Sequence, residues 1–351
     1  MKLQFKPNDV PYRLPRPNNM GVVRYAMAFY VVWVHFSALT GIDMPATQYV
    51  VDVVNGFFAL SGFLVMGPYL REPRLKPFFV GRCWRLLPAY WTSVLLFAVV
   101  LFFFSTSADY FASAQFWKYL AANMMFLNFL EPDLPGVFLS NPAMSAVNGA
   151  LWTMKVEWML YLSVPLVAWA LGRCKRRPAV VLILIYVVSG LYRAFLLSLH
   201  AKTGSELYRI LSYQFVGQFM YFYSGMLVYY YFDLFVRLRR WVFPVCLVLL
   251  LCFIDHPVFG LTLKPLVITL LVLWLSMTGR WGAWEGAHEN LSYGIYLVHF
   301  PLIQIVVLLG LPQRMGVWPA LLLVALAAVA VAWVVNAFVE RPLRRRFFRK
   351  S

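Results

Sequence analysis

The sequence predicts an all-α polytopic membrane protein with about ten transmembrane helices. Three observations on its 351 residues support this class: 62% are hydrophobic, 13% are charged, and the formal net charge is +17. Soluble domains usually have about 25% charged and about 45–50% apolar residues, and disordered chains are far less apolar. The long uncharged stretches also argue against a nucleic-acid-binding protein, although the net charge is positive.

Ten stretches are apolar over a length close to the roughly 20 residues that a helix needs to cross a bilayer. They cover residues 21–39, 50–66, 88–104, 151–171, 179–199, 213–235, 241–254, 265–278, 293–311 and 317–339. The first is not expected to be a cleaved signal peptide, because His35 interrupts its apolar run and further spans follow. In the second, Ser61 and Gly62 are small residues of the kind that permit close helix packing.

The distribution of basic residues gives the expected orientation, since Lys and Arg are enriched in cytoplasmic loops. Five basic clusters lie near residues 2–16, 71–85, 173–177, 237–240 and 341–350. All five fall on one side if the apolar stretch 116–130 does not cross the membrane. We therefore expect both termini to be cytoplasmic and an outer loop, 105–150, to contain an interfacial or re-entrant segment. The alternative is that 116–130 is an eleventh span with inverted topology after it.

We expect a single transmembrane domain over residues 1–351, with its helical bundle at 20–340. The tail, 341–351, is predicted to be cytoplasmic and to rest on the anionic headgroups of membrane lipid. The four cysteines have no CxxC spacing. The sequence therefore predicts neither a metal site nor a disulfide framework.

Ionisable side chains inside the spans are the candidate functional residues, because a charge in a bilayer is costly. Arg24 and His35 lie in the first span, about 16 Å apart on a similar helix face. Glu157 and Arg193 fall at a similar outer depth to His35 in the fourth and fifth spans, and Lys155 lies at the same level. The pattern predicts that these side chains share one layer in the outer half of the membrane, and it favours a functional role for His35. The alternative is that Lys155 and Arg193 only balance the charge of Glu157.

Two further sets of residues have simpler alternatives. Arg82 and Arg85 are three positions apart and share a helix face at the cytoplasmic end of the third span. The alternative is that they are basic residues of the kind that only mark the cytoplasmic side of a span, which lie in the same place. For His299, in the ninth span, we favour a structural interhelical hydrogen bond over a functional role.

Six short motifs occur in a fixed order along the chain. They are the Arg24–His35 pair, NGFFALSGFLV (55–65), RCWRLLPAYW (82–91), LWTMKVEWMLYLSVP (151–165), LSYGIYLVHFPLI (291–303) and ERPLRRR (340–346). Together they resemble the acyltransferase-3 family of integral membrane acyltransferases, typified by bacterial O-acetyltransferases of cell-surface glycans. The resemblance extends from about Gly21 to Arg345. The chain departs from the family at Asn55, where an Asp is common, and in the three residues before Arg24.

The resemblance implies an O-acyltransferase with a cytoplasmic acyl-CoA donor, acetyl-CoA above all, and no permanently bound cofactor. Arg82, Arg85 and Arg24 would hold the phosphates of the donor, for which a planar guanidinium is well suited. His35 would act as the general base that activates the acceptor hydroxyl. Glu157 would orient the imidazole of His35 or stabilise its charged form.

The implied acceptor is a hydroxyl of an extracytoplasmic glycan or lipid-linked saccharide, and the implied location is the bacterial inner (cytoplasmic) membrane. Trp152, Tyr161 and Arg193 are the candidate substrate-binding residues, the aromatic pair because flat rings suit the C–H surfaces of sugars. A nucleophilic Ser61 is disfavoured, because the sequence suggests no adjacent base. Direct transfer and a covalent acyl-enzyme both stay open.

Three other functions stay open on the sequence. A transporter or flippase of a lipid-linked saccharide also needs charged residues in the membrane, but it predicts a half-chain symmetry that is not visible. A structural subunit of an envelope complex leaves the Arg24–His35 and Arg82–Arg85 pairs unexplained. An enzyme of the unrelated membrane-bound O-acyltransferase superfamily would use a histidine deep in a late span, which makes His299 its catalytic candidate.

Overall fold

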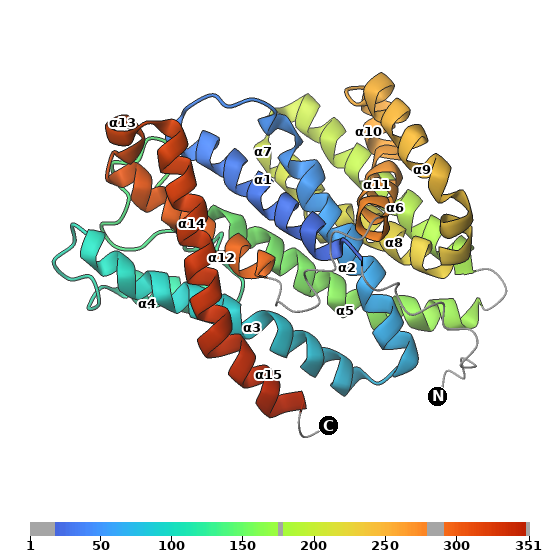
Figure 1. Cartoon of the computed structure of the whole chain (residues 1–351), viewed down its shortest axis with the longest axis horizontal. Helices are drawn as coiled ribbons and strands as arrows, with labels where there is room; N and C mark the ends of the chain where they lie inside the picture. Colours follow the sequence, from blue (N-terminus) through green and yellow to red (C-terminus); the bar gives the residue numbers. More distant parts are fainter. Residues whose placement is uncertain (1–17, 175–177, 279–290, 349–351) are drawn as a thin grey trace. The chain divides into compact units, whose positions relative to one another are not determined.

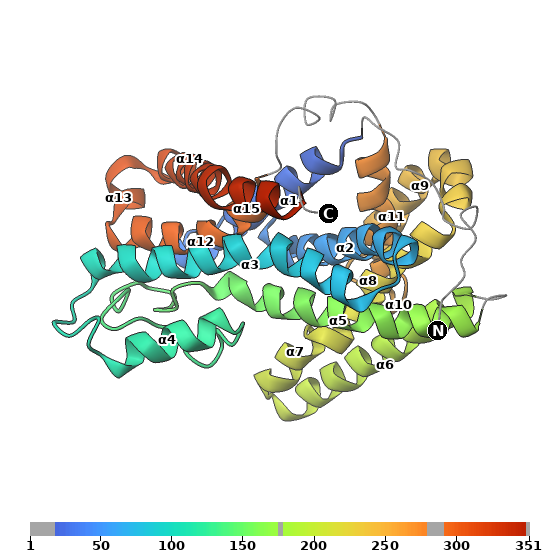
Figure 2. The same ribbon diagram turned by 90° about the horizontal axis from the view of Figure 1, so that it is seen from below.

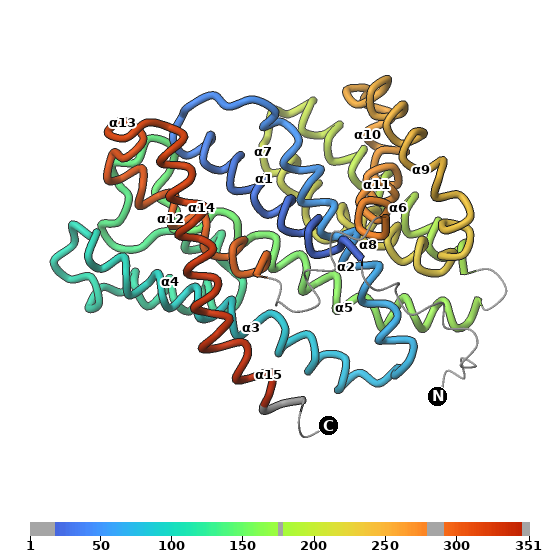
Figure 3. Tube along the Cα trace, viewed as in Figure 1, coloured from blue at the N-terminus to red at the C-terminus, as the bar shows by residue number. Residues whose placement is uncertain are grey.

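The computed structural model describes residues 18–174, 178–278 and 291–348 of the chain. In these ranges the secondary structure is helical and contains no strand, which confirms the all-α prediction. Figure 1 shows the helices as ribbons, and Figure 3 follows the same path as a tube. The N-terminal basic cluster, residues 175–177 and the last three residues of the basic tail lie outside the described residues.

The helices differ widely in length. The α-helices are α1 (Met20–Thr40), α2 (Val50–Arg71), α3 (Leu75–Val100), α4 (Ala114–Met124), α5 (Trp152–Arg173), α6 (Pro178–Thr203), α7 (Glu206–Ser212), α8 (Phe215–Tyr230), α9 (Phe232–Phe253), α10 (Pro257–Thr262), α11 (Lys264–Met277), α12 (Ser292–Leu308), α13 (Leu311–Met315), α14 (Val317–Val335) and α15 (Arg341–Phe348). The 3₁₀ turns are η2 (Thr47–Tyr49), η3 (Leu101–Phe104) and η4 (Gly149–Leu151), and a π-helical turn, η6 (Asn336–Glu340), joins α14 to α15.

Six helical segments of the described chain are long and apolar enough to cross a membrane. They are Met20–Thr40, Thr47–Arg71, Leu75–Phe104, Gly149–Arg173, Pro178–Thr203 and Val317–Arg345. Two shorter apolar helices, α11 and α12, have 14 and 17 residues. These helices indicate a multi-pass membrane protein, while the count of about ten crossings and the sidedness of the termini stay predictions.

Helix α9 differs from the expected spans. It runs without a break through the basic stretch 237–240, so the expected span at 241–254 is the second half of α9 and not a separate helix. Arginine is a good helix former, and the side chains of 237–240 are exposed and not packed against the rest of the described chain. The basic stretch therefore continues a helix that we expected it to interrupt.

Helix α3 begins at Leu75, well before its expected start at Pro88, which lies inside the helix. A proline is tolerated within a membrane helix because the backbone groups that it frees find other partners. In α3 the carbonyl that loses its usual helical donor to Pro88 is that of Trp84. Because the helix begins early, Arg82 and Arg85 both belong to α3 and, being three apart, project from one side of it.

The outer loop contains the short helix α4. Its 11 residues span about 16 Å, roughly half the thickness of a bilayer core. The Ser113 side chain caps its first turn, and Phe116, Tyr119 and Asn123 form its buried face at helical spacing. Residues 116–130 thus form no helix long enough to span, and their interfacial placement stays a prediction.

The packing of the chain divides it into two compact units. Unit 1 comprises residues 1–23, 51–79 and 156–288, and unit 2 comprises residues 24–50, 80–155 and 289–351. Each unit is thus assembled from separated segments of the chain, and each contains a helix that is buried along most of its length.

In unit 1 the buried helix is α8, with 11 of its 16 residues buried. Two glycines let it approach α2 closely. A Cβ at Gly62 would lie 1.8 Å from the carbonyl oxygen of Phe222, and one at Gly225 would lie 2.1 Å from that of Ala59. The close packing that the sequence suggests at Gly62 is therefore present, and it depends on the missing side chain.

In unit 2 the buried helix is α12, with 12 of its 17 residues buried. Figure 2 shows α12 between α14 and α3. Gly294 of α12 faces Ala332 of α14, where a Cβ on the glycine would lie 2.8 Å from the alanine methyl carbon. On the α3 side, the Tyr293 hydroxyl donates to the carbonyl of Leu86 at 3.0 Å. Helix α12 is thus the element against which the candidate residues of unit 2 are positioned.

Candidate active site

Two histidines from distant parts of the sequence meet inside unit 2. Helix α1 carries His35 and helix α12 carries His299, and Nδ1 of His35 lies 2.8 Å from Nε2 of His299. The two rings are nearly parallel, at 13°, with centroids 5.1 Å apart. The His299 side chain is fully buried, whereas His35 is partly exposed. The pair therefore has one inner member and one member that solvent or substrate can approach.

The inner histidine is fixed by its own helix. Nδ1 of His299 lies 2.7 Å from the backbone carbonyl oxygen of Tyr296, one turn earlier in α12. The Tyr296 hydroxyl in turn pairs with the Thr153 hydroxyl at 2.8 Å. Both ring nitrogens of His299 thus have partners, and the ring has a defined orientation.

A proline holds this part of α12 against its neighbours. Pro301 has no backbone N–H, so the carbonyl of Leu297 lacks its usual helical donor. Ser93 Oγ of α3, at 3.2 Å, and Asn148 Nδ2 of the outer loop, at 2.8 Å, donate to that carbonyl instead. The proline therefore ties α12 to two other segments within two residues of His299.

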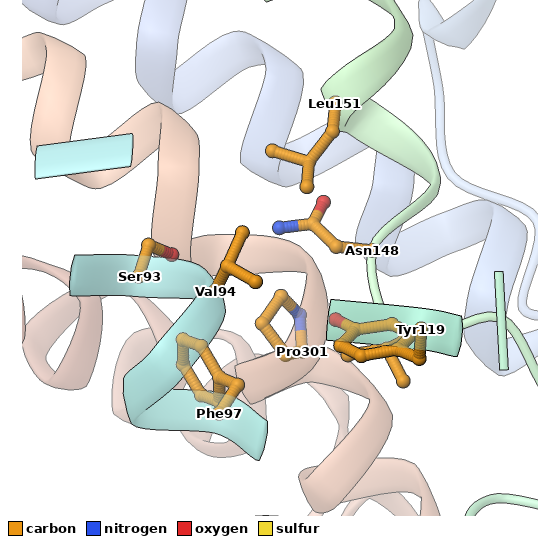
Figure 4. Close-up of a pocket in the computed structure, with 8 residues that line it drawn as sticks. Ser93, Val94, Phe97, Tyr119, Asn148, Leu151 and Pro301 are labelled. Carbon is orange, nitrogen blue, oxygen red and sulfur yellow. The ribbon is translucent and has the colours of Figure 1, made fainter. Parts of the chain in front are cut away.

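Aromatic and small residues enclose the pair. The ring of Phe300 meets that of His35 edge-on, with centroids 5.3 Å apart. Gly149 packs directly on Phe300, since a Cβ there would lie 2.9 Å from the ring. A neighbouring gap of about 170 Å³, shown in Figure 4, is lined by residues that include Ser93, Asn148 and Pro301. It has no room for a water molecule, so we assign no substrate to it.

The basic candidates of unit 2 lie where three helices converge. Arg24 is on α1, and Arg82 and Arg85 are on α3; Arg85 is exposed and the other two are partly exposed. The residue after Arg24, Tyr25, accepts a hydrogen bond of 2.8 Å at its hydroxyl from the backbone N–H of Leu291. The residue after Arg85 is the Leu86 that Tyr293 contacts.

The start of α12 thus joins both arginine-bearing segments. From Ser292, at that start, His299 is seven residues further along, which is about 10 Å. The same helix therefore carries the link between the arginines at one end and His299 further along. This arrangement suits a ligand that has anionic groups at one end and a reactive group at the other.

Glu157 belongs to unit 1, where two hydroxyls bind its carboxylate. Tyr161, on the same helix, donates a hydrogen bond of 2.5 Å to Glu157 Oε1, and Ser61 of α2 donates one of 3.2 Å. The two hydroxyl oxygens are 2.8 Å apart. The sequence suggests no base beside Ser61, whereas the structure puts a carboxylate there. Trp152, by contrast, belongs to unit 2 and lies partly exposed at the first turn of α5.

Arg193 is a buried cation in unit 1. Its side chain on α6 is 6% exposed, Nη1 lies 3.8 Å from Sδ of Met220, and the guanidinium faces the rings of Tyr213 and Tyr221 at 5.4 and 5.6 Å. Its Nε has no hydrogen-bond partner in the described part of the chain. The surroundings are thus aromatic and apolar.

Asp52, an acidic side chain of the same unit, already has a basic partner. Asp52 of α2 forms an ion pair of 2.8 Å with Lys264 of α11, and the described residues of unit 1 contain no salt bridge to Arg193. Lys155, in unit 2, lies over the ring of Phe129 at 4.3 Å. The described hydrogen bonds to Glu157 come from hydroxyls, and the alternative that Lys155 and Arg193 only balance its charge stays open.

The sequence predicts an interhelical hydrogen bond for His299 but does not identify the residue that forms it. The interhelical bond is present, and the partner is the predicted base, His35. One sequence feature could have drawn attention to His299. It is the motif LSYGIYLVHFPLI, which places a histidine in an apolar helix two residues before a proline. Only the packing of α1 against α12 connects the two rings.

Comparison with known proteins identifies the family. The family model described as an acyltransferase domain, that of the acyltransferase-3 family, matches residues 18–337. Nodulation protein 10 of Rhizobium leguminosarum bv. viciae is 25% identical to the chain, and the match covers 47% of the chain and 47%, about half, of that curated relative. No solved structure gives a significant match. The chain therefore belongs to the acyltransferase-3 family.

Proposed function

We propose that the protein moves an acyl group, acetyl above all, from cytoplasmic acyl-CoA to a hydroxyl of an extracytoplasmic sugar or glycan. The observation that carries this proposal is the His35–His299 pair, which lies in the same unit as Arg24, Arg82 and Arg85. We place the protein in the bacterial cytoplasmic membrane with about ten crossings and both termini inside, on the support of the basic clusters.

The three arginines are the proposed site for the phosphates of the donor. Acyl-CoA carries a diphosphate and a 3′-phosphate, and guanidinium groups bind such oxygens through paired hydrogen bonds. Arg82 and Arg85 lie on one side of α3, and the start of α12 links their segment to that of Arg24. A donor bound there by its phosphates directs its thioester along α12 towards His35.

His35 is the proposed general base for the acceptor hydroxyl, which is a poor nucleophile at neutral pH. Nδ1 of His35 already binds His299, and that is the position an orienting carboxylate takes in a catalytic triad. Glu157 remains a proposed catalytic residue, and in unit 1 its carboxylate accepts hydrogen bonds from Tyr161 and Ser61. Trp152 and Tyr161 are the proposed aromatic contacts of the acceptor.

Replacing either arginine of α3 tests the donor site. Arg82→Ala and Arg85→Ala are each expected to raise the KM for acetyl-CoA about 10- to 100-fold, because a charged hydrogen bond contributes about 1.5–3 kcal/mol. The measurement is transfer of radiolabelled acetyl to de-O-acylated surface glycan in isolated membranes. Arg74→Ala is the control, since Arg74 is 72% exposed and its described partner is Glu72. An unchanged KM in both variants, or an equal rise in the control, contradicts the proposed donor site.

Arg193 gives a prediction for the acceptor. We propose that it binds an anionic group of the acceptor, a phosphate or a carboxylate. Arg193→Met is then expected to raise the KM for the acceptor about 10- to 100-fold without lowering the melting temperature, because a buried charge without a counter-ion is costly in a membrane. The measurements are acceptor titration and thermal unfolding in detergent.

The matched control for Arg193 is Lys264→Met in the same unit. That change leaves Asp52 without its ion-pair partner, so it is expected to lower the melting temperature while the acceptor KM stays at the wild-type value. A lower melting temperature with an unchanged acceptor KM in Arg193→Met assigns Arg193 a structural role and overturns this part of the proposal.

A further inference from the structure

We infer that His299 is a positioning residue that fixes the tautomer of His35 and leaves Nε2 of His35 as the atom that takes the acceptor proton. The inference rests on the proposed function and deepens it, since it assigns the proton transfer to one atom. It follows from two hydrogen bonds, one at each ring nitrogen of His299.

The first step concerns the proton on His299. The carbonyl oxygen of Tyr296 can only accept, so Nδ1 of His299, 2.7 Å away, must carry a hydrogen and donate it. A neutral imidazole has a single N–H. Nε2 of neutral His299 is therefore an acceptor.

The second step transfers this constraint to His35. Nδ1 of His35 faces that acceptor at 2.8 Å, so it must be the donor. In neutral His35 the single hydrogen is then on Nδ1, and Nε2 carries a free lone pair. The backbone of α12 thus determines, through His299, which nitrogen of His35 can act as a base.

The neutral pair is favoured over a charged one. A doubly protonated His299 could donate to His35, but its side chain is fully buried, where an unpaired charge is costly. No carboxylate is ion-paired to either ring in the described part of unit 2. The buried member therefore stays neutral, and charge develops on the partly exposed member, His35.

The proton balance of the transfer is complete without another reagent. The acceptor hydroxyl gives its proton to Nε2 of His35 while its oxygen bonds to the acyl carbon. The bond between that carbon and the thioester sulfur breaks, and the leaving CoA thiolate takes the proton from Nε2. Throughout, Nδ1–H of His35 remains donated to Nε2 of His299, a neutral acceptor in the position that the aspartate takes in a triad.

Two amide substitutions at His299 test the inference, because Gln and Asn have the same amide group and differ only in side-chain length. In His299→Gln the side-chain oxygen lies near the position of Nε2 and can accept from His35, whereas in His299→Asn the amide is too short. We expect His299→Asn to lower kcat about 10²- to 10⁴-fold with an unchanged KM for acetyl-CoA, and His299→Gln to recover most of the lost kcat. The assay is the same glycan acetylation in isolated membranes, scaled to the amount of folded protein.

Gln304→Leu is the structural control on the same helix. Gln304 is fully buried and donates to the carbonyls of Met144 and Ala146, each at 2.9 Å. These bonds are separate from the hydrogen bonds that fix the tautomer of His35. This variant is expected to lose folded protein while the remaining protein keeps its kcat. A structural role for His299 predicts the same behaviour for His299→Asn.

The inference is overturned if His299→Asn keeps the wild-type kcat per folded molecule, or if His299→Gln is as slow as His299→Asn. Its failure is distinct from failure of the proposed function. If His35→Ala is inactive and His299→Asn is fully active, His35 remains the proposed base and the positioning role of His299 is wrong. If His35→Ala is fully active, the proposed base and the positioning role of His299 are both wrong.

Discussion

His35→Ala is expected to lower kcat for acyl transfer about 10²- to 10⁴-fold, the usual contribution of a positioned general base. The alanine removes the nitrogen that takes the acceptor proton, while the arginines of α1 and α3 remain. The KM for acetyl-CoA is therefore expected to stay within about twofold of the wild-type value, as for a group that acts in the transition state alone. The measurement is acetyl-CoA-dependent acetylation of de-O-acylated surface glycan.

His200→Ala is the matched control for this prediction. His200 lies near the end of α6, where its ring contacts the carbonyl of Ser205 and lies 3.8 Å from the Glu206 carboxylate. It has no place in the proposed reaction, so its loss is expected to leave kcat unchanged. Wild-type kcat in His35→Ala would remove the proposed base, and an equal loss in His200→Ala would point to a general effect on folding.

The second large effect is structural. Gly62→Ala is expected to destabilise unit 1 strongly, because the new Cβ would lie 1.8 Å from the carbonyl oxygen of Phe222 and 2.7 Å from its carbon. These are backbone atoms of α8, so no side chain can move aside, and α2 must separate from α8. Overpacking usually costs about 1–3 kcal/mol and sometimes more. A melting temperature lowered by several degrees, or a large loss of folded protein, is the expected result in detergent.

Gly260→Ala provides the comparison in the same unit. Gly260 lies in α10, and a Cβ there meets no atom within 4 Å. In a helix, this change is expected to be neutral or to stabilise by about 0.4–1 kcal/mol. Equal melting temperatures for Gly62→Ala and Gly260→Ala would contradict the close contact between α2 and α8.

The helices were largely predictable from the sequence, and their boundaries less so. Long apolar runs predict α1, α2, α6 and α14, because a helix that crosses the lipid core needs about 20 mostly apolar residues. The basic stretch 237–240 was misleading, since positive charge marks a membrane boundary but does not end a helix, and α9 continues through it. Pro88 misled in the same way, because a proline is tolerated inside a membrane helix and α3 continues through it.

The candidate site was predictable residue by residue but not as a set of contacts. A histidine and an arginine on one face of an apolar helix are costly and therefore conspicuous, which singled out His35 and Arg24. The partner of His35 could not be read from the sequence, because 263 residues separate it from His299 and only tertiary packing joins α1 to α12. The hydroxyl partners of Glu157 likewise come from α2 and from one turn further along α5.

The most direct test of the central claim uses sealed inverted membrane vesicles from cells that make the wild-type protein or His35→Ala. Radiolabelled acetyl-CoA is added outside, at the former cytoplasmic face, and acetylated glycan is recovered from the lumen. We predict labelled lumenal glycan with the wild-type protein and about 10²- to 10⁴-fold less with His35→Ala, with no intact CoA in the lumen. Equal labelling by the two proteins would contradict the claim that His35 carries out acyl transfer from a cytoplasmic donor.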